Sequence, residues 1–397
     1  MAIGDRALVS GTNFVVTIIV AKSVGVAQYG SFVLLSTVLL FSTGIQSALI
    51  LNPMRVLAVS NDHAEEQRDT VNQAHLQIRL CLLLSLVVLA GGYFTDIPIA
   101  LLSIFVVAVT LLQIQEFVRS TFLIRGNFSA LLQLDGTSLT IRLGIVASAA
   151  IAGILDLRVA FAAMAVSFLF GVRFLCANLL GEASKSIRRV SVENWTHARW
   201  LLLETLLYSI SVQAYLFIAA RELGAEAAGG IGAIQNIFNA ANVIQLGLIG
   251  YYTPALRRLW LRDAKTTWIQ IVVRLALLLV SIMGFLTISL YWAGEEILEV
   301  IYKPEFAKYK SVVPLLGAFY CLGSINTVLN MAFRTADKPE IGFRAKLLSS
   351  IVALLAGIPL VQKFGIEGAA SGLAITQIIW AIAYAISLSN LNIRTRS

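Results

Sequence analysis

The sequence predicts an all-α polytopic membrane protein of about twelve transmembrane helices, arranged as two similar six-helix lobes. Three observations lead to this fold class. Charged residues make up 13% of the chain and hydrophobic residues 58%, whereas an ordinary soluble domain is about 25% charged. About twelve windows of roughly 20 mostly apolar residues have the length that crosses ~30 Å of hydrocarbon. Their apolar runs are continuous, which favours helices over alternating strands, and one motif recurs in each half.

The apolar windows define the expected spans in order along the chain. They are 4–23, 30–51, 78–95, 97–117, 131–153, 157–180, 200–220, 226–251, 267–292, 312–333, 343–361 and 367–389. No cleavable signal peptide is expected, because the first window begins near the N-terminus without a basic leader or a small-residue cleavage site. The external connections are short, which leaves no room for a folded external catalytic domain.

Two similar stretches indicate that the chain is an internal duplication. Residues 21–30 match residues 220–229, and each stretch leads through an apolar run to a proline flanked by arginine. The matched positions are Gly25 with Gly224, offset by 199, and Pro53 with Pro254, offset by 201. An even number of spans separates the first helix from the seventh, so both halves have the same orientation, with a pathway expected between them. We expect an N-terminal lobe at 1–180, a cytoplasmic linker at 181–199 and a C-terminal lobe at 200–397.

The distribution of lysine and arginine predicts that both termini are cytoplasmic. In this orientation 20 of the 30 cations flank the spans on the cytoplasmic side, including Arg119 and Arg125, and seven lie outside. Cytoplasmic flanks carry the excess of these residues in multi-pass proteins. The other three, Arg142, Arg173 and Arg274, lie within spans. Topology therefore explains the net charge of +8 better than nucleic-acid binding does.

Polar stripes on three spans indicate a shared aqueous cavity. The stripe of the first span comprises Arg6, Ser10, Asn13 and Thr17; that of the seventh comprises Glu204, Tyr208, Ser211 and Tyr215; and that of the eighth comprises Gln235, Asn239, Asn242 and Gln245, with Asn236 at its edge. Each set has the spacing of one helical face. We expect Arg6, Asn13, Tyr208, Gln235, Asn239 and Asn242 to bind substrate. The alternative is hydrogen bonding between helices, worth ~0.6 kcal/mol per contact on average.

The fifth span carries the strongest single signal, because Asp135, Ser138 and Arg142 share one face. Arg142 lies near the middle of this span, where an arginine costs ~3 kcal/mol unless it faces water, a carboxylate or an anion. We expect Arg142 to bind a phosphate-bearing substrate, and the alternative is a structural pair with a carboxylate elsewhere. Asp135 and Glu204 are weaker candidates for ion coupling. Arg173 and Arg274 lie nearer the span ends, where snorkelling explains them.

Signatures of enzymes and cofactor sites are absent from the sequence. There is no G-x-x-x-x-G-K-[ST] phosphate loop, so the protein is not expected to be an ATPase. The histidines His63, His75 and His197 lack metal-ligand spacing. The cysteines fall inside expected spans and are read as small buried hydrophobic residues. We therefore expect no catalytic residue, no metal and no cofactor.

Motifs at residues 21–32, 229–242, 297–302 and 364–372 resemble those of Wzx-type polysaccharide and O-antigen flippases, which are members of the multidrug/oligosaccharidyl-lipid/polysaccharide superfamily. Residues 21–32 look like that family's "A-R-x-L-G-x-x-x-Y-G-x-F" start of the second helix. Residues 229–242 look like its eighth helix, and residues 297–302 with Phe306 look like the loop before its tenth. Residues 364–372 are similar to its "G-x-x-G-A-A-x-A" helix start. The resemblance covers essentially the whole chain.

The resemblance implies a flippase that moves undecaprenyl-diphosphate-linked oligosaccharide across the bacterial cytoplasmic (inner) membrane by alternating access, for surface polysaccharide biosynthesis. The implied partners are the lipid-linked oligosaccharide, membrane lipid, and the polysaccharide polymerase and chain-length machinery. A second hypothesis is a cation-coupled drug or metabolite antiporter of the same fold, with Asp135 and Glu204 facing the cavity and Arg142 neutralised. A third is a membrane glycosyltransferase, polymerase or ligase acting on lipid-linked sugars.

Overall fold

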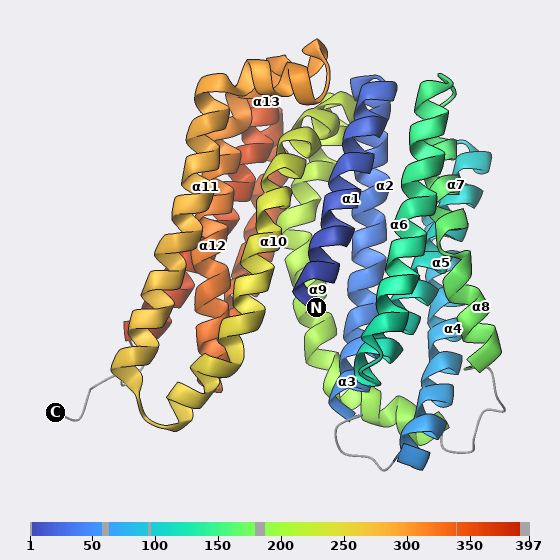
Figure 1. Ribbon diagram of the computed structural model, residues 1–397. Coiled ribbons are helices and arrows are strands. Elements are labelled where there is room, and N and C mark those ends of the chain that lie inside the picture. The colour runs from blue at the N-terminus through green and yellow to red at the C-terminus, as the bar shows by residue number, and fades with distance from the viewer. Residues whose placement is uncertain (1, 58–62, 94–96, 179–186, 339, 390–397) are drawn as a thin grey trace. The chain divides into compact units, whose positions relative to one another are not determined.

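The computed structural model describes the chain except for residues 1, 58–62, 94–96, 179–186, 339 and 390–397. The side chain of Arg6 also lies outside the described part. The described residues are almost entirely helical and contain no strand (Figure 1). The α-helices are α1 (Ala2–Ser23), α2 (Val26–Gln46), α3 (Asn52–Leu57), α4 (His63–Tyr93), α5 (Ile99–Ile124), α6 (Phe128–Ile151), α7 (Leu157–Ser167), α8 (Leu169–Asn178), α9 (Ile187–Leu223), α10 (Ala225–Leu261), α11 (Lys265–Ile301), α12 (Val313–Thr335) and α13 (Glu340–Ser389). A π-helical turn, η1 (Ser47–Leu51), follows α2, and a 3-10 segment, η2 (Pro304–Val312), precedes α12.

These helices confirm the predicted all-α membrane fold. Within the described residues, nine helical segments are long and apolar enough to cross a membrane, and one of them, α13, contains two predicted spans joined at Gly365. The shorter apolar stretch Leu8–Ser23 of α1 and helix α10 supply the other two. α10 is not among the nine segments, and five amide side chains interrupt its apolar surface. The chain is therefore a multi-pass membrane protein.

The helices form two compact units. Unit 1 comprises Met1–Val24 and Leu35–Leu206, and unit 2 comprises Gly25–Leu34 and Leu207–Ser397. α2 and α9 therefore each contribute residues to both units. Part of the expected linker, 181–186, lies outside the described residues, and the rest of it belongs to α9. The division into lobes at residues 180 and 200 stays a prediction.

Each unit has an apolar core of its own. In unit 1, Phe117 of α5 and Leu134 of α6 are fully buried in a cluster that also includes side chains of η1, α3, α4 and α8. In unit 2, Trp268 and Leu275 of α11 pack with Val328 of α12 and with side chains of α10. These cores hold α5 against α6 and α10 against α12, and they thereby set the positions of the polar side chains on those helices.

Buried amides at equivalent positions of the two halves make similar helix-to-helix bonds. Gln46, at the end of α2, donates to the Gln113 carbonyl oxygen at 2.6 Å and to the Gln77 side-chain oxygen at 3.0 Å. Gln245 of α10 accepts a hydrogen bond from Ser324 of α12 at 2.9 Å. The offset from Gln46 to Gln245 is 199, the same as from Gly25 to Gly224. The internal duplication is therefore visible in interior polar contacts as well as in the glycine motif.

The recurring glycine motif near the C-terminus forms a sharp helix-to-helix corner. Gly365 has φ 59° and ψ −138° inside α13, a conformation that side chains with a Cβ rarely adopt. A Cβ added at Gly368 would lie 2.0 Å from the Leu360 carbonyl oxygen. The two glycines let the chain turn and pack its backbone tightly at this point. The positive φ accounts for Gly365, and close backbone packing accounts for Gly368.

We expect Gly365→Ala to lower the free energy of unfolding by about 1–3 kcal/mol, because a non-glycine residue is strained at this backbone conformation. Thermal unfolding of the purified protein in detergent measures the effect. Gly284→Ala in α11 is the matched control, since a Cβ there meets nothing within 4 Å. Equal melting temperatures for the two variants would contradict the assignment of Gly365 as the corner.

Candidate functional site

The candidate site in unit 1 is the buried face of α6. Asn127 caps the start of this helix, because its side-chain oxygen accepts a hydrogen bond from the Ala130 backbone N–H at 3.1 Å. Asp135, Ser138 and Arg142 then follow on one face, and all three are buried. Each reaches a different partner, so the face forms three successive polar contacts along the helix.

The first contact is an ion pair between Asp135 and Arg119 of α5. Arg119 Nε lies 2.8 Å from Asp135 Oδ2, and Glu116 approaches the same guanidinium at 3.8 Å. Sequence analysis placed Arg119 among the flanking cytoplasmic cations, but α5 continues to Ile124 and buries it. The expected ion-coupling role of Asp135 stays a prediction. A coupling ion would have to compete with Arg119, which is already bound to the carboxylate.

The second contact is neutral and joins α5 to α6. The Gln115 side-chain nitrogen donates to Ser138 Oγ at 2.9 Å, and Ser138 Oγ lies 3.0 Å from the Gln115 side-chain oxygen. Both side chains are almost fully buried. Since Asp135 and Arg142 are about 10 Å apart by helical rise, this uncharged contact lies between the ion pair and the second arginine.

The third contact joins a buried cation to a neutral side chain. Arg142 is 8% exposed, and its Nη1 donates to the Asn13 side-chain oxygen of α1 at 2.7 Å. Its Nε has no hydrogen-bond partner. Among the residues that the structure describes, no carboxylate forms an ion pair with Arg142. The positive charge on this face is therefore held by a neutral amide, and Asn13 is itself exposed.

The candidate site in unit 2 is the amide stripe of α10. The Tyr320 hydroxyl of α12 lies 3.0 Å from the Asn239 side-chain oxygen and 3.3 Å from the Gln235 carbonyl oxygen. Asn242 donates to the same Asn239 oxygen at 3.2 Å. Sequence analysis did not single out Tyr320, because its partners lie about 80 residues earlier. Part of the stripe thus makes helix-to-helix bonds, as the alternative interpretation expected.

The other expected site residues divide between the units. Tyr208 is 42% exposed in unit 2, and its ring lies 6.0 Å from the buried ring of Trp380. Glu204 lies in unit 1 and is half-buried. Arg6 belongs to α1, with a side chain outside the described part. The structure thus brings Asn13 together with Arg142, and Gln235 together with Asn239 and Asn242; one cavity shared by all of these residues stays a prediction.

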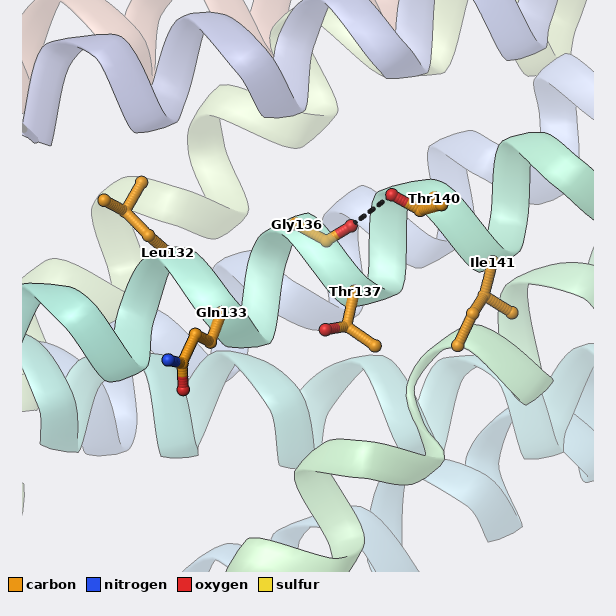
Figure 2. A pocket seen from close by; sticks show the side chains of 6 residues that line it. All are labelled: Leu132, Gln133, Gly136, Thr137, Thr140 and Ile141. Carbon is orange, nitrogen blue, oxygen red and sulfur yellow. Dashed lines mark hydrogen bonds between the residues drawn. The ribbon is translucent and has the colours of Figure 1, made fainter.

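A shallow pocket lies on the opposite face of α6 (Figure 2). Its lining residues are Leu132, Gln133, Gly136, Thr137, Thr140 and Ile141. None of these was an expected site residue, and all six belong to one helix. The Thr140 hydroxyl is already used in a 2.8 Å bond to the Gly136 carbonyl oxygen. A single uncharged helix face does not enclose a ligand, so the candidate site remains on the Arg142 face.

We expect Asp135→Asn to destabilise the protein by about 3–5 kcal/mol, because it leaves Arg119 as a buried charge that has lost its closest partner. Thermal unfolding in detergent measures the loss. The double variant Arg119→Met, Asp135→Leu removes both charges and should recover most of the stability. A stable Asp135→Asn protein would show that this pair does not hold α5 to α6.

No protein-family model matches this sequence, and no curated protein matches it either. Solved structures do match its fold. A multidrug resistance MATE family transporter of the MOP superfamily, in an inward-facing conformation, superposes with a TM-score of 0.77 at 11% identity, covering 97% of this chain and 94% of that one. The lipid II flippase MurJ, in an inward closed conformation, gives 0.67 at 12% identity, covering 97% and 86%.

A MOP superfamily transporter from Pyrococcus furiosus Vc1 gives a TM-score of 0.64 at 10% identity, covering 98% of this chain and 94% of that one. The work on that protein describes a binding pocket of reversed polarity that suggests a different function. Identities this low establish the fold without establishing the substrate. The chain therefore has the fold that the MATE transporter, the MurJ flippase and the Pyrococcus protein share.

Proposed function

We propose that this protein is a flippase that moves undecaprenyl-diphosphate-linked oligosaccharide across the bacterial cytoplasmic membrane for surface polysaccharide synthesis. It would work by alternating access, with both termini in the cytoplasm. A polysaccharide polymerase and chain-length machinery would act on the product. The membrane fold, its likeness to a lipid II flippase and the sequence motifs of polysaccharide flippases support this proposal.

The observation that carries the proposal is the buried charge of Arg142. A cation inside a membrane protein is costly unless an anion or water compensates it. Asp135 is already paired with Arg119, whereas Arg142 has the neutral Asn13 as its partner and an unpaired Nε. A guanidinium in this state is well suited to a diphosphate, because charge-assisted hydrogen bonds to phosphate are short and strong.

The amides of unit 2 fit the sugar part of the proposed substrate. Asn239 is exposed and Asn242 is half-buried. The side-chain nitrogen of Asn239 and the side-chain oxygen of Asn242 form no hydrogen bond to a described residue. An amide offers both donors and acceptors, so it can bind sugar hydroxyls in several orientations. The exposed ring of Tyr208 could add an apolar surface for a sugar ring. The lipid tail would stay in the bilayer.

A cation-coupled antiporter is the second candidate, and the fold likeness to the MATE transporter favours it. Such a protein needs a carboxylate that faces the cavity and is free to bind a cation. The ion pair with Arg119 occupies Asp135, and Glu204 is the other acidic residue that this candidate would use. The charge arrangement in unit 1 therefore favours an anionic substrate over a cationic one.

We expect Arg142→Gln to reduce flipping of a polyprenyl-diphosphate-linked oligosaccharide by about tenfold to a hundredfold, because one charged hydrogen-bond donor is worth about 1.5–3 kcal/mol. The assay uses proteoliposomes, with an impermeant enzyme that destroys the oligosaccharide remaining in the outer leaflet. Arg142→Lys should keep part of the activity, since it retains the charge without the fork of donors.

Arg274→Gln is the matched control for this prediction. Arg274 also lies on a predicted span, but it is exposed. Its loss should leave flipping unchanged. Equal activity of wild type and Arg142→Gln would remove Arg142 from the binding site. Absence of flipping by the wild type, together with export of a cationic dye against a proton or sodium gradient, would replace the flippase by the antiporter.

A further inference from the structure

A close helix crossing inside unit 2 joins the two repeated motifs to each other. The segment Gly25–Leu34, which includes the start of α2, belongs to unit 2 and packs against the start of α10. A Cβ added at Gly30 would lie 1.8 Å from the Ala225 carbonyl oxygen, and one added at Gly229 would lie 2.5 Å from the Val26 carbonyl oxygen. Two backbones therefore touch here with no side chain between them. We call Val26, Gly30, Ala225 and Gly229 the glycine seam.

The glycine seam is reciprocal between the two halves of the chain. Val26 and Ala225 are offset by 199 residues, and so are Gly30 and Gly229. Gly30 lies against Ala225, which is the counterpart of Val26. In the same way Gly229, the counterpart of Gly30, lies against Val26. This exchange is the mark of a two-fold symmetric interface between equal partners. The duplicated motif has glycine at these positions because the backbone of each copy packs directly against the backbone of the other.

Burial of a tyrosine hydroxyl beside the glycine seam costs free energy and so opposes closure of the seam. Tyr29 is fully buried, and its ring packs at 5.5 Å from Phe306 and 6.2 Å from Tyr302. Its hydroxyl lies near that of Tyr302 but forms no hydrogen bond of good geometry with a described residue. The nearby Tyr302 hydroxyl already donates to the Ala233 carbonyl oxygen and accepts from Asn236. A buried hydroxyl without a partner is unfavourable, and water would satisfy it if the seam opened.

The helix α2 carries one side of the glycine seam and contributes residues to both units. This helix passes without a break from the segment that belongs to unit 2 into the segment from Leu35 that belongs to unit 1. If the units move relative to each other, either α2 must bend or its first turns must leave α10. The four seam residues have no side-chain charge, so parting them exposes no unpaired ion.

We infer that the glycine seam is a latch, closed in this structure, that opens when the first turns of α2 separate from α10. The tight backbone contact would stabilise the closed state. Hydration of the Tyr29 hydroxyl would stabilise the open state. Such a balance of opposing terms allows two conformations of similar free energy. The inference goes beyond the proposed function, because it does not depend on which molecule the protein carries.

The test follows the accessibility of a cysteine placed at the seam. Ala228, the counterpart of Tyr29, is fully buried, and Ala228→Cys is a small change. The three native cysteines, Cys81, Cys176 and Cys321, are replaced by alanine. Alkylation of the new thiol by a membrane-permeant maleimide is then timed in membrane vesicles, without any substrate. Gly30→Ala and Gly229→Ala are introduced singly and together, with Gly250→Ala of α10 as the matched control, since a Cβ there meets nothing within 4 Å.

We expect Gly30→Ala and Gly229→Ala each to speed alkylation by about tenfold or more, which is the population shift that 1.4 kcal/mol of lost contact produces. The double variant should be close to the faster single one, because either methyl group already opens the same contact. Tyr29→Phe should slow alkylation, and Gly250→Ala should leave it unchanged. Melting temperatures in detergent exclude general unfolding as the cause of faster labelling.

Equal labelling rates in the seam variants and in Gly250→Ala would overturn the inference, as would complete protection of the thiol in every folded variant. A protein that shows the expected labelling but flips no oligosaccharide would keep the latch and refute the proposed function. A protein that flips oligosaccharide while the seam thiol stays protected would support the proposed function and refute the latch.

Discussion

The requirement to pair polar groups inside membrane-spanning helices governs the interior of this protein. Hydrocarbon offers no hydrogen-bond partners, so each buried polar group must find one within the chain. Unit 1 meets this requirement with successive contacts between α5 and α6, first an ion pair and then the bonds between Gln115 and Ser138. Amides at matching positions, Gln46 and Gln245, do the same for the two halves. These bonds fix which helix faces meet, and the apolar cores fill the space around them.

Arg142 departs from this rule, and the departure is what makes it a candidate for binding. Its neighbour on the same face, Asp135, is paired with Arg119, so Arg142 has the exposed neutral amide of Asn13 as its partner. A structural arginine in the same place would be expected to have a carboxylate opposite it. An anionic substrate would supply the missing charge, and departure of that substrate would restore the unfavourable state.

Glycine serves two different purposes in this chain. At Gly365 it provides a backbone conformation that turns α13. At Gly30 and Gly229 it removes side chains, so that α2 and α10 touch along their backbones. The second use creates a contact without charges. Tight but uncharged contacts can form and part at a small cost in free energy.

Sequence alone determined the class of the protein, because hydropathy and length specify membrane helices whatever their neighbours are. It also located the duplication, since the offset of 199 residues is a property of the chain. Spacing along α6 placed Asp135, Ser138 and Arg142 on one face, and the structure has all three buried there. Spacing could not identify the partner residue of each of these side chains.

The partners of Asp135, Arg142 and Asn239 are Arg119, Asn13 and Tyr320, at separations of 16, 129 and 81 residues. Arg119 looked like a flanking cation because its burial depends on how far α5 extends and on what packs against it. The seam between Gly30 and Gly229 was equally out of reach, although both glycines were recognised as repeats. Local periodicity describes one helix at a time, and only tertiary packing decides which helices face each other and which side chain becomes the partner of each buried charge.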